Sequence, residues 1–161
     1  VRDAVQALRS FSGVKRRLEF KQAIAGVSFY DDFGHHPTAI NTVLQTLSAN
    51  KQQGRIFALV ELGSYTMRNG LMADRLAEVL KIYCAHSIVY LSPNEATDFD
   101  WSQWVAQHPT IDFMDDHDQI VNDIMARVRS ADTVITFSSR NFSAIHQAFK
   151  QHSLACSVNT E

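Results

Sequence analysis

The sequence predicts an α/β fold: an open, mostly parallel sheet of about six strands, with helices on both faces and an N-terminal β-hairpin. Apolar stretches of strand length alternate with stretches of helical periodicity through most of the chain, which is typical of a parallel sheet with right-handed crossovers. The run 55–61 is apolar almost throughout and so predicts a strand covered on both faces. The 161 residues, of which 45% are hydrophobic, suffice for one domain with its own core.

Each element follows from its local pattern. Segments 18–24 and 27–30 flank Ala25-Gly26 and predict the hairpin. The apolar side chains of 38–47 recur at helical spacing, and Pro37 suits the first turn of that helix. The later elements expected are a strand at 55–61, a helix from about Met67 to Tyr83, a strand at 87–91, an irregular stretch with a short helix at 92–110, a weak strand at 111–114, a helix opening at 115–118, a strand at 133–137, and a helix from about Phe142 to His152.

Composition excludes several classes of protein. The net charge is −2 and the one dense basic patch is 15–17, so nothing favours nucleic acid or an anionic membrane as a partner. No apolar run approaches the roughly 20 residues that span a bilayer. Cys84 and Cys156 lack CxxC spacing, which argues against a disulfide framework or a zinc knuckle and predicts a reducing, cytoplasmic location.

The turn Tyr30-Asp-Asp-Phe-Gly-His-His-Pro37 is the strongest site candidate, because ligands collect at the carboxyl ends of strands in open parallel sheets. Asp32 can accept hydrogen bonds from a ribose or an ammonium group, while His35 and His36 can orient or polarise a substrate. The same residue types can also cap the following helix, and the residues alone leave both readings open. For the run 115–118, at another helix start, we favour capping over metal binding.

Two phosphate-binding motifs are absent from the sequence. No GxxxxGK[ST] loop and no GxGxxG fingerprint occurs, so any nucleotide must be held mostly by another part of the protein. The chain also begins with Val1 rather than Met, and we expect it to be a fragment.

Three ordered motifs resemble the C-terminal domain of the Mur ligase family. They are Phe11-Ser-Gly-Val-Lys-Arg-Arg-Leu-Glu19, Tyr30-Asp-Asp-Phe-Gly-His-His-Pro-Thr-Ala-Ile40 and Glu61-Leu-Gly-Ser-Tyr-Thr-Met-Arg-Asn-Gly70. The resemblance implies a Rossmann-like domain at 12–161 that closes over the site, with 1–11 as the tail of a central ATPase domain. It also implies that ATP and Mg²⁺ are bound mainly by that central domain, and that this fragment alone is inactive and holds no stoichiometric metal.

Within the family, the pattern resembles most the ligases that join a recycled murein tripeptide, L-Ala-γ-D-Glu-meso-diaminopimelate, to UDP-N-acetylmuramate. The members that attach L-alanine to the same nucleotide sugar are the nearest alternative. Either activity would make the protein an ADP-forming amide-bond ligase of peptidoglycan biosynthesis or recycling. Its expected partners are UDP-N-acetylmuramate, the tripeptide and its own N-terminal and central domains.

The resemblance also assigns roles to single residues. Arg17 matches the catalytic arginine that reaches the ATP phosphates, and Asp32 matches an aspartate that contacts the nucleotide. The chain departs from the recycling ligases at Glu61-Leu-Gly-Ser64, where they typically read Glu-Pro-Arg-Ser, and at Ser139-Arg-Asn-Phe142, where they carry a Gly-rich turn. We expect Arg140 to replace the lost positive charge. The residues expected to bind the incoming substrate are Phe33, His35, His36, Ser64, Thr66, Arg68, Arg140 and Ser143.

Two alternatives belong to other classes. A divalent-metal hydrolase could use Asp31, Asp32 and His35 with Asp115 and His117, and metal content would distinguish it. A receiver-like phosphoacceptor domain could use the acidic pair at the strand end, but this chain has Ser138-Ser-Arg140 where such domains place a lysine.

Overall fold

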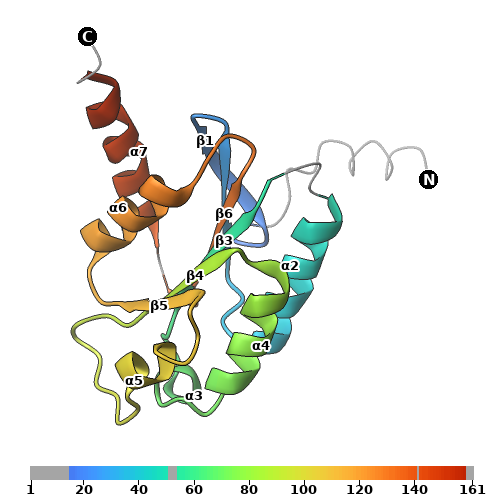
Figure 1. The fold of residues 1–161 in the computed structure, drawn as a ribbon, viewed down its shortest axis with the longest axis vertical. Coiled ribbons are helices and arrows are strands. Elements are labelled where there is room, and N and C mark those ends of the chain that lie inside the picture. The colour runs from blue at the N-terminus through green and yellow to red at the C-terminus, as the bar shows by residue number, and fades with distance from the viewer. Residues whose placement is uncertain (1–14, 51–53, 141, 159–161) are drawn as a thin grey trace.

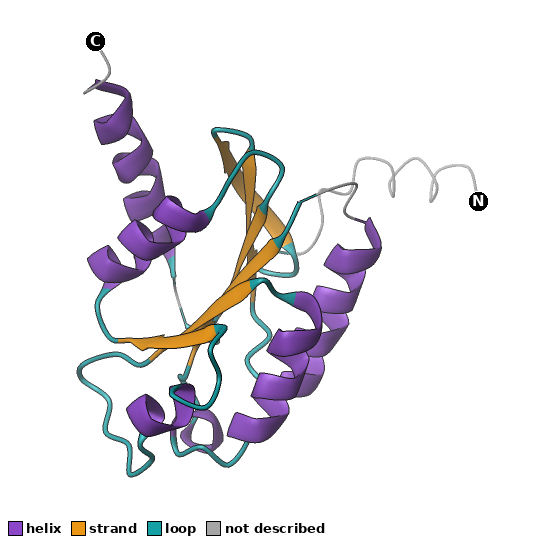
Figure 2. Cartoon of the chain, in the orientation of Figure 1, coloured by secondary structure: helices purple, strands orange, loops and turns teal. Residues whose placement is uncertain are grey.

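The computed structural model describes residues 15–50, 54–140 and 142–158, and the expected tail at 1–11 lies outside them. The described residues form one six-stranded sheet in the order β1-β2-β6-β3-β4-β5 (Figures 1 and 2). β1 pairs antiparallel with β2, and all other neighbours are parallel, which confirms the predicted fold class. The strands are β1 (Glu19–Ile24), β2 (Val27–Asp32), β3 (Ile56–Glu61), β4 (His86–Tyr90), β5 (Ile111–Met114) and β6 (Thr133–Phe137).

The hairpin between β1 and β2 turns at the predicted dipeptide. Ala25 and Gly26 have φ values of 49° and 80°, as a two-residue hairpin turn with left-handed central residues requires. The antiparallel strand β1 therefore begins beside the carboxyl end of β2, where Glu19 pairs with Asp31. This pairing brings the basic segment 15–17 to the end of β2.

Helices cover both faces of the sheet. In Figure 1, α2 (Pro37–Asn50) and α4 (Ala73–Tyr83) lie on one side, and α6 (His117–Arg127) and α7 (Ser143–Val158) lie on the other. The central strand β3 is buried at every position because its side chains alternate between the two cores. Ala58 and Val60 pack with α2 and α4, whereas Phe57 and Leu59 pack with α6 and α7.

The parallel register brings four strand ends to one edge of the sheet. Phe137 at the end of β6 pairs with Asp32 of β2 and with Val60 of β3, and Glu61 pairs with Tyr90 at the end of β4. We call this edge, with the loops that leave it, the carboxyl edge. The opposite edge, where β4 and β5 begin, is the amino edge.

The prediction of one helix from Met67 to Tyr83 is wrong. Two helices occupy this stretch, α3 (Tyr65–Arg68) and α4, and the chain turns between them at Gly70, whose φ is +73°. A Cβ at Gly70 would lie 2.1 Å from Cδ2 of Phe99, so the ring packs where a side chain would stand. The apolar Leu71 and Met72 continued the helical pattern in the sequence, but Leu71 is exposed.

Other local predictions are confirmed. The irregular stretch contains α5 (Trp101–Val105), whose two tryptophans are buried and pack edge to face with ring centroids 5.0 Å apart. Asp116 caps α6 by accepting a hydrogen bond from the backbone N–H of Gln119 at 2.8 Å. No helix in the described ranges is both long and apolar enough to cross a bilayer.

Candidate functional site at the carboxyl edge

The acidic pair that ends β2 is divided between two structural roles. Asp31 is buried and pairs with Arg16, whose Nε lies 3.1 Å from Asp31 Oδ2. Thr136 Oγ1 donates to Asp31 Oδ1 at 2.9 Å, and His146 Nε2 lies 3.8 Å from the same oxygen. Burial alone would raise the pKa of Asp31, but its interactions with His146, Thr136 and Arg16 together lower it below its ordinary value. Asp31 is therefore an ionised anchor for Arg16.

Asp32 organises the backbone around the turn. Its side chain is 1% exposed, and its two carboxylate oxygens accept from the N–H of Leu18 at 2.7 Å and of Gly34 at 2.6 Å. The N–H of Phe33 donates to the carbonyl oxygen of Arg16 at 2.9 Å. These bonds fix the segment that carries Arg16 and Arg17 against the end of β2.

Aromatic and imidazole rings gather just beyond this turn. The ring of Phe33 is partly exposed, and the guanidinium of Arg16 lies 5.4 Å from its centroid. The centroid of the His35 ring lies 5.5 Å from that of Phe33 and 5.0 Å from that of His36. The structure thus brings the rings of Phe33, His35 and His36 together and places Arg16 beside Phe33.

A second group joins three loops through one carboxylate. Arg140 donates to Glu95 Oε1 at 2.5 Å and to the carbonyl oxygen of Gly63 at 3.2 Å, while Arg68 pairs with Glu95 Oε2. Hydrogen bonding to Arg140 lowers the pKa of Glu95, and the same bond raises the pKa of Arg140. Two guanidinium groups therefore grip one carboxylate at the carboxyl edge, and we call Arg68, Glu95 and Arg140 the arginine pair and its bridge.

The backbone of this second group is held firmly. Ser64 is the N-cap of α3, since its hydroxyl accepts from the N–H of Met67 at 3.4 Å, and it lies 3.3 Å from the hydroxyl of Thr66. The carbonyl oxygen of Arg68 accepts from Trp101 Nε1 at 2.7 Å and from Thr97 Oγ1 at 2.6 Å. These bonds tie the loop after β3 to the loop after β4.

Ser138 links the two groups. It is fully buried, its hydroxyl donates to the buried carboxylate of Glu61, and that hydroxyl accepts from the N–H of Arg140 at 2.8 Å. Its carbonyl oxygen accepts from the Arg16 guanidinium at 2.5 Å. The loop after β6 therefore lies between the Phe33 turn and the arginine pair.

Two further predicted site residues are exposed. Arg17 is exposed and forms no ion pair with any of the residues that the structure describes. Ser143 is exposed at the first position of α7. Both lie next to the carboxyl edge, Arg17 before β1 and Ser143 after the loop that leaves β6.

The geometry does not support a metal hydrolase at this edge. Asp31 and Asp32 turn their carboxylates toward different partners, and Asp116 caps a helix. His117 stacks on aromatic rings, with its centroid 4.9 Å from that of Tyr90. None of Asp31, Asp32, His35, Asp115 and His117 belongs to the one group of three potential metal ligands within the described ranges.

Three residues of this edge escaped sequence reasoning: Arg16, Glu61 and Glu95. Arg16 directly precedes Arg17, the arginine to which the sequence assigns a catalytic role. The backbone of Arg16 is left-handed, with φ 57°, and Arg16 points inward whereas Arg17 faces solvent. Glu61 ends a strand and begins the third motif, but its position in the sequence does not indicate its bond to Ser138. Glu95 lies in an irregular loop, where no periodic signal exists to indicate its partners.

Comparisons with known proteins identify the family of the chain. The family model described as "Mur ligase, glutamate ligase domain" matches residues 16–140. The UDP-N-acetylmuramate–L-alanyl-γ-D-glutamyl-meso-2,6-diaminoheptandioate ligase of Haemophilus influenzae is 32% identical over 151 residues, covering 91% of this chain and 32% of that protein. The chain thus spans about a third of this curated relative's length.

Two solved structures share the fold. The murein peptide ligase of Psychrobacter arcticus superposes with a TM-score of 0.72 at 27% identity, over 93% of this chain and 32% of that one. A domain from a Haemophilus ducreyi protein, described as a putative UDP-N-acetylmuramate:L-alanyl-γ-D-glutamyl-meso-diaminopimelate ligase, gives a TM-score of 0.68 at 29% identity, over 85% of this chain and 99% of that one. The chain belongs to the Mur ligase family, and its fold is that of the family's C-terminal domain.

Proposed function

We propose that this chain is the substrate-positioning domain of a cytoplasmic, ATP-dependent, ADP-forming ligase of peptidoglycan recycling. The whole enzyme would join the tripeptide L-Ala-γ-D-Glu-meso-diaminopimelate to UDP-N-acetylmuramate. The similarity to the Haemophilus influenzae ligase, whose name states these substrates, supports this choice. The lack of a phosphate-binding loop in the chain is consistent with ATP and Mg²⁺ being bound mainly by a central domain.

The observation that carries the proposal is the arginine pair and its bridge. Arg68 and Arg140 converge on the carboxylate of Glu95, so their geometry is suited to one carboxylate at a time. The tripeptide carries three carboxylates and a free amine at its L-alanine end. We propose that a peptide carboxylate binds Arg140 in exchange for Glu95. The charge of Arg140 would thus serve in place of the arginine missing at Leu62-Gly63.

The other predicted residues would contribute to the same substrate site. Phe33, His35 and His36 lie at the carboxyl edge, separated from the arginine pair by the loop after β6, and Ser64, Thr66 and Ser143 add hydroxyl groups along that edge. Arg17 is exposed and held at the edge by the Asp32 turn, so it could reach ATP phosphates presented by another domain. Asp32 is buried and bonded to backbone amides, so its contribution to nucleotide binding would come through the position of that turn.

The chemistry that this domain would assist has two steps. The muramoyl carboxylate takes the γ-phosphoryl group of ATP, which gives an acyl phosphate and ADP. The peptide amine then attacks the acyl carbon, loses a proton and expels phosphate. Holding the amine close to the acyl phosphate makes the second step effectively unimolecular, and a guanidinium at the departing phosphate stabilises its developing charge. Closure of the domain would exclude water, which otherwise hydrolyses the intermediate.

A calorimetric titration of the chain with the tripeptide, and with L-alanine as the control ligand, tests the proposal. We expect the tripeptide to bind and L-alanine not to bind. Arg140→Gln should weaken tripeptide binding by about 10-fold, because it removes a charge-assisted contact from a half-exposed position. Arg75→Gln, on the exposed side of α4, is the matched control and should leave binding unchanged. Equal affinity for both ligands would contradict the assignment.

A further inference from the structure

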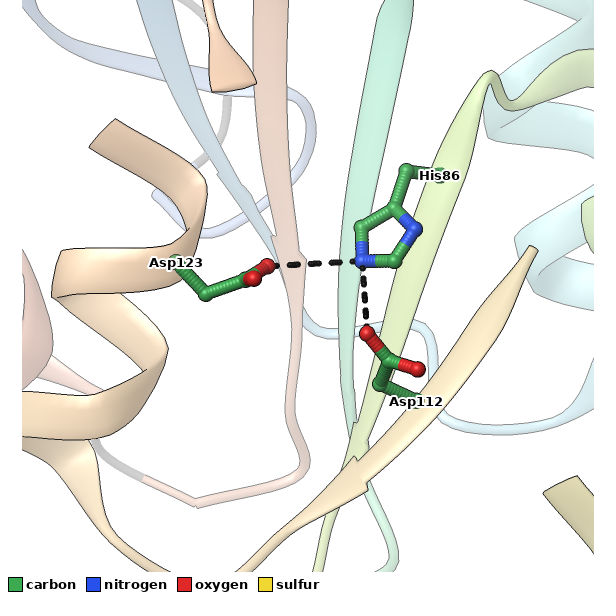
Figure 3. A group of neighbouring side chains, drawn as sticks. All are labelled: His86, Asp112 and Asp123. Atoms are coloured by element: carbon green, nitrogen blue, oxygen red, sulfur yellow. Dashed lines mark ion pairs between the residues drawn. The ribbon is translucent and has the colours of Figure 1, made fainter. Parts of the chain in front are cut away.

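A second cluster of potential ligands lies at the amino edge, far from the arginine pair along the strands. His86 is the first residue of β4, Asp112 is on the neighbouring strand β5, and Asp123 is in the middle of α6. Figure 3 shows the three side chains pointing at one another from these three elements. One atom from each lies within 4.8 Å of the others.

The imidazole of His86 points into this cluster, but its Nε2 atom has no hydrogen-bond partner there. His86 is 8% exposed, and its Nε2 is buried and makes no hydrogen bond. Nε2 lies 3.3 Å from Asp112 Oδ2 and 3.4 Å from Asp123 Oδ2. Charge-assisted hydrogen bonds are shorter, at about 2.7–2.9 Å. The two measured distances are therefore too long for a strong hydrogen bond from Nε2 to either carboxylate oxygen.

The spacing instead matches a tetrahedral metal site. With metal–ligand distances of about 2.0–2.1 Å, as for Zn²⁺ with imidazole nitrogen and carboxylate oxygen, the edge of a tetrahedron is about 3.4 Å. The two measured N···O separations are 3.3 and 3.4 Å. In place of the expectation that the domain holds no stoichiometric metal, we propose that His86, Asp112 and Asp123 bind a divalent transition-metal ion of the Zn²⁺ class, with a fourth coordination position left open to solvent.

The ligand chemistry agrees with this assignment. Burial, and then the charge of Arg127, lower the pKa of His86, so the imidazole is neutral at pH 7 and keeps a lone pair to donate. One imidazole and two carboxylates suit Zn²⁺ and its neighbours in the first transition series better than Ca²⁺ or Mg²⁺, which prefer oxygen ligands throughout. A pocket of about 320 Å³, lined by Arg55, His86 and Arg127 among others, borders the imidazole.

Arg127 competes with the ion for the same carboxylates. Its guanidinium lies 2.8 Å from Asp123 Oδ1 and 3.5 Å from Asp112 Oδ2, and its side chain is 45% exposed. A guanidinium that is half exposed can move into solvent, so metal binding exchanges one counter-charge for another. The ion would then tie the edge strand β5 and helix α6 to β4, and it should stabilise the fold.

The test is a Zn²⁺ titration of chelator-treated chain, with free zinc followed by a competing indicator. We expect one equivalent to bind the wild-type chain and to raise its melting temperature. Asp112→Asn should weaken binding by at least about 10-fold, because loss of a direct ligand costs no less than loss of an outer-shell contact. Asp118→Asn, an exposed carboxylate on α6, is the matched control and should bind as the wild type does.

Two further measurements separate a metal site from a structural ion pair. Co²⁺ should give visible absorption bands of a tetrahedral site in the wild type and in Asp118→Asn, but not in Asp112→Asn. Arg127→Gln should lower stability without metal and raise Zn²⁺ affinity, because the competing cation is gone. The proposal is overturned if the wild-type chain binds no stoichiometric Zn²⁺, if Asp112→Asn binds as tightly as the wild type, or if Arg127→Gln binds no more tightly.

Discussion

Replacing Asp31 by Asn should destabilise the domain and change how its stability depends on pH. The substitution keeps the shape of the side chain but removes the charge that pairs with Arg16 at 3.1 Å and accepts from Thr136 at 2.9 Å. Breaking a buried ion pair costs about 3–5 kcal/mol, and a hydrogen bond to a charged group contributes about 1.5–3 kcal/mol. Because Arg16 is 22% exposed and Asn can still accept from Thr136, we expect a loss of about 2–4 kcal/mol at pH 7.

The pH dependence follows from the direction of the pKa shift. The folded state lowers the pKa of Asp31, so its stabilising contribution is present above the unfolded-state pKa of about 3.9 and is lost as pH falls through the folded-state value. Protonated Asp31 resembles Asn, so the difference between wild type and Asp31→Asn should shrink below about pH 4.

Urea denaturation of both chains at pH 7 and at pH 3 measures this difference. Asp115→Asn, which removes an exposed carboxylate, is the control and should change the free energy of unfolding by no more than about 0.5 kcal/mol. A loss for Asp31→Asn below about 1 kcal/mol at pH 7, or a loss equal at both pH values, would refute the account of Asp31 as an ionised anchor.

Two further substitutions test residues that support the candidate site. Gly70→Ala should cost about 2–4 kcal/mol, because it forces a side chain into a left-handed backbone and against the Phe99 ring; an unchanged thermal unfolding midpoint would show that this turn can relax. Ser138→Ala should cost about 1–3 kcal/mol, because the buried Glu61 carboxylate loses a donor; restoration by Ser138→Thr, but not by Cys, in denaturant unfolding would show that the hydroxyl is responsible.

The sequence predicted the sheet well because each strand carries its own signal. Runs such as 55–61 and 133–137 are apolar and bounded by turn residues. Such runs are typical of the inner strands of a parallel sheet, which are buried on both faces. The one wrong helix had a continuous apolar pattern through Leu71 and Met72. The chain turns instead at Gly70, whose backbone is left-handed and against which Phe99 packs, almost 30 residues later in the chain. A window of local sequence cannot contain such a contact.

Only those residues of the candidate site that lie at strand ends could be placed from the sequence, because the topology of the sheet fixes where the strand ends lie. Strand ends in a parallel sheet meet at one edge, so Asp32, Phe33 and Ser64 were placed correctly without any distance information. The bridge at Glu95 and the inward turn of Arg16 depend on loop conformations, which have no periodicity to indicate them. The cluster of His86, Asp112 and Asp123 joins two strands and a helix at spacings that match no metal motif.

The whole protein is proposed to join the amine of the tripeptide, rather than that of L-alanine, to UDP-N-acetylmuramate. The most direct measurement is ADP formation by the full-length protein that carries this chain, supplied with ATP, Mg²⁺ and UDP-N-acetylmuramate, and with either the tripeptide or L-alanine. We expect a kcat/KM at least about 100-fold higher for the tripeptide, because the proposed contact between Arg140 and a peptide carboxylate is one that L-alanine would not make. Equal or higher kcat/KM for L-alanine would contradict the account.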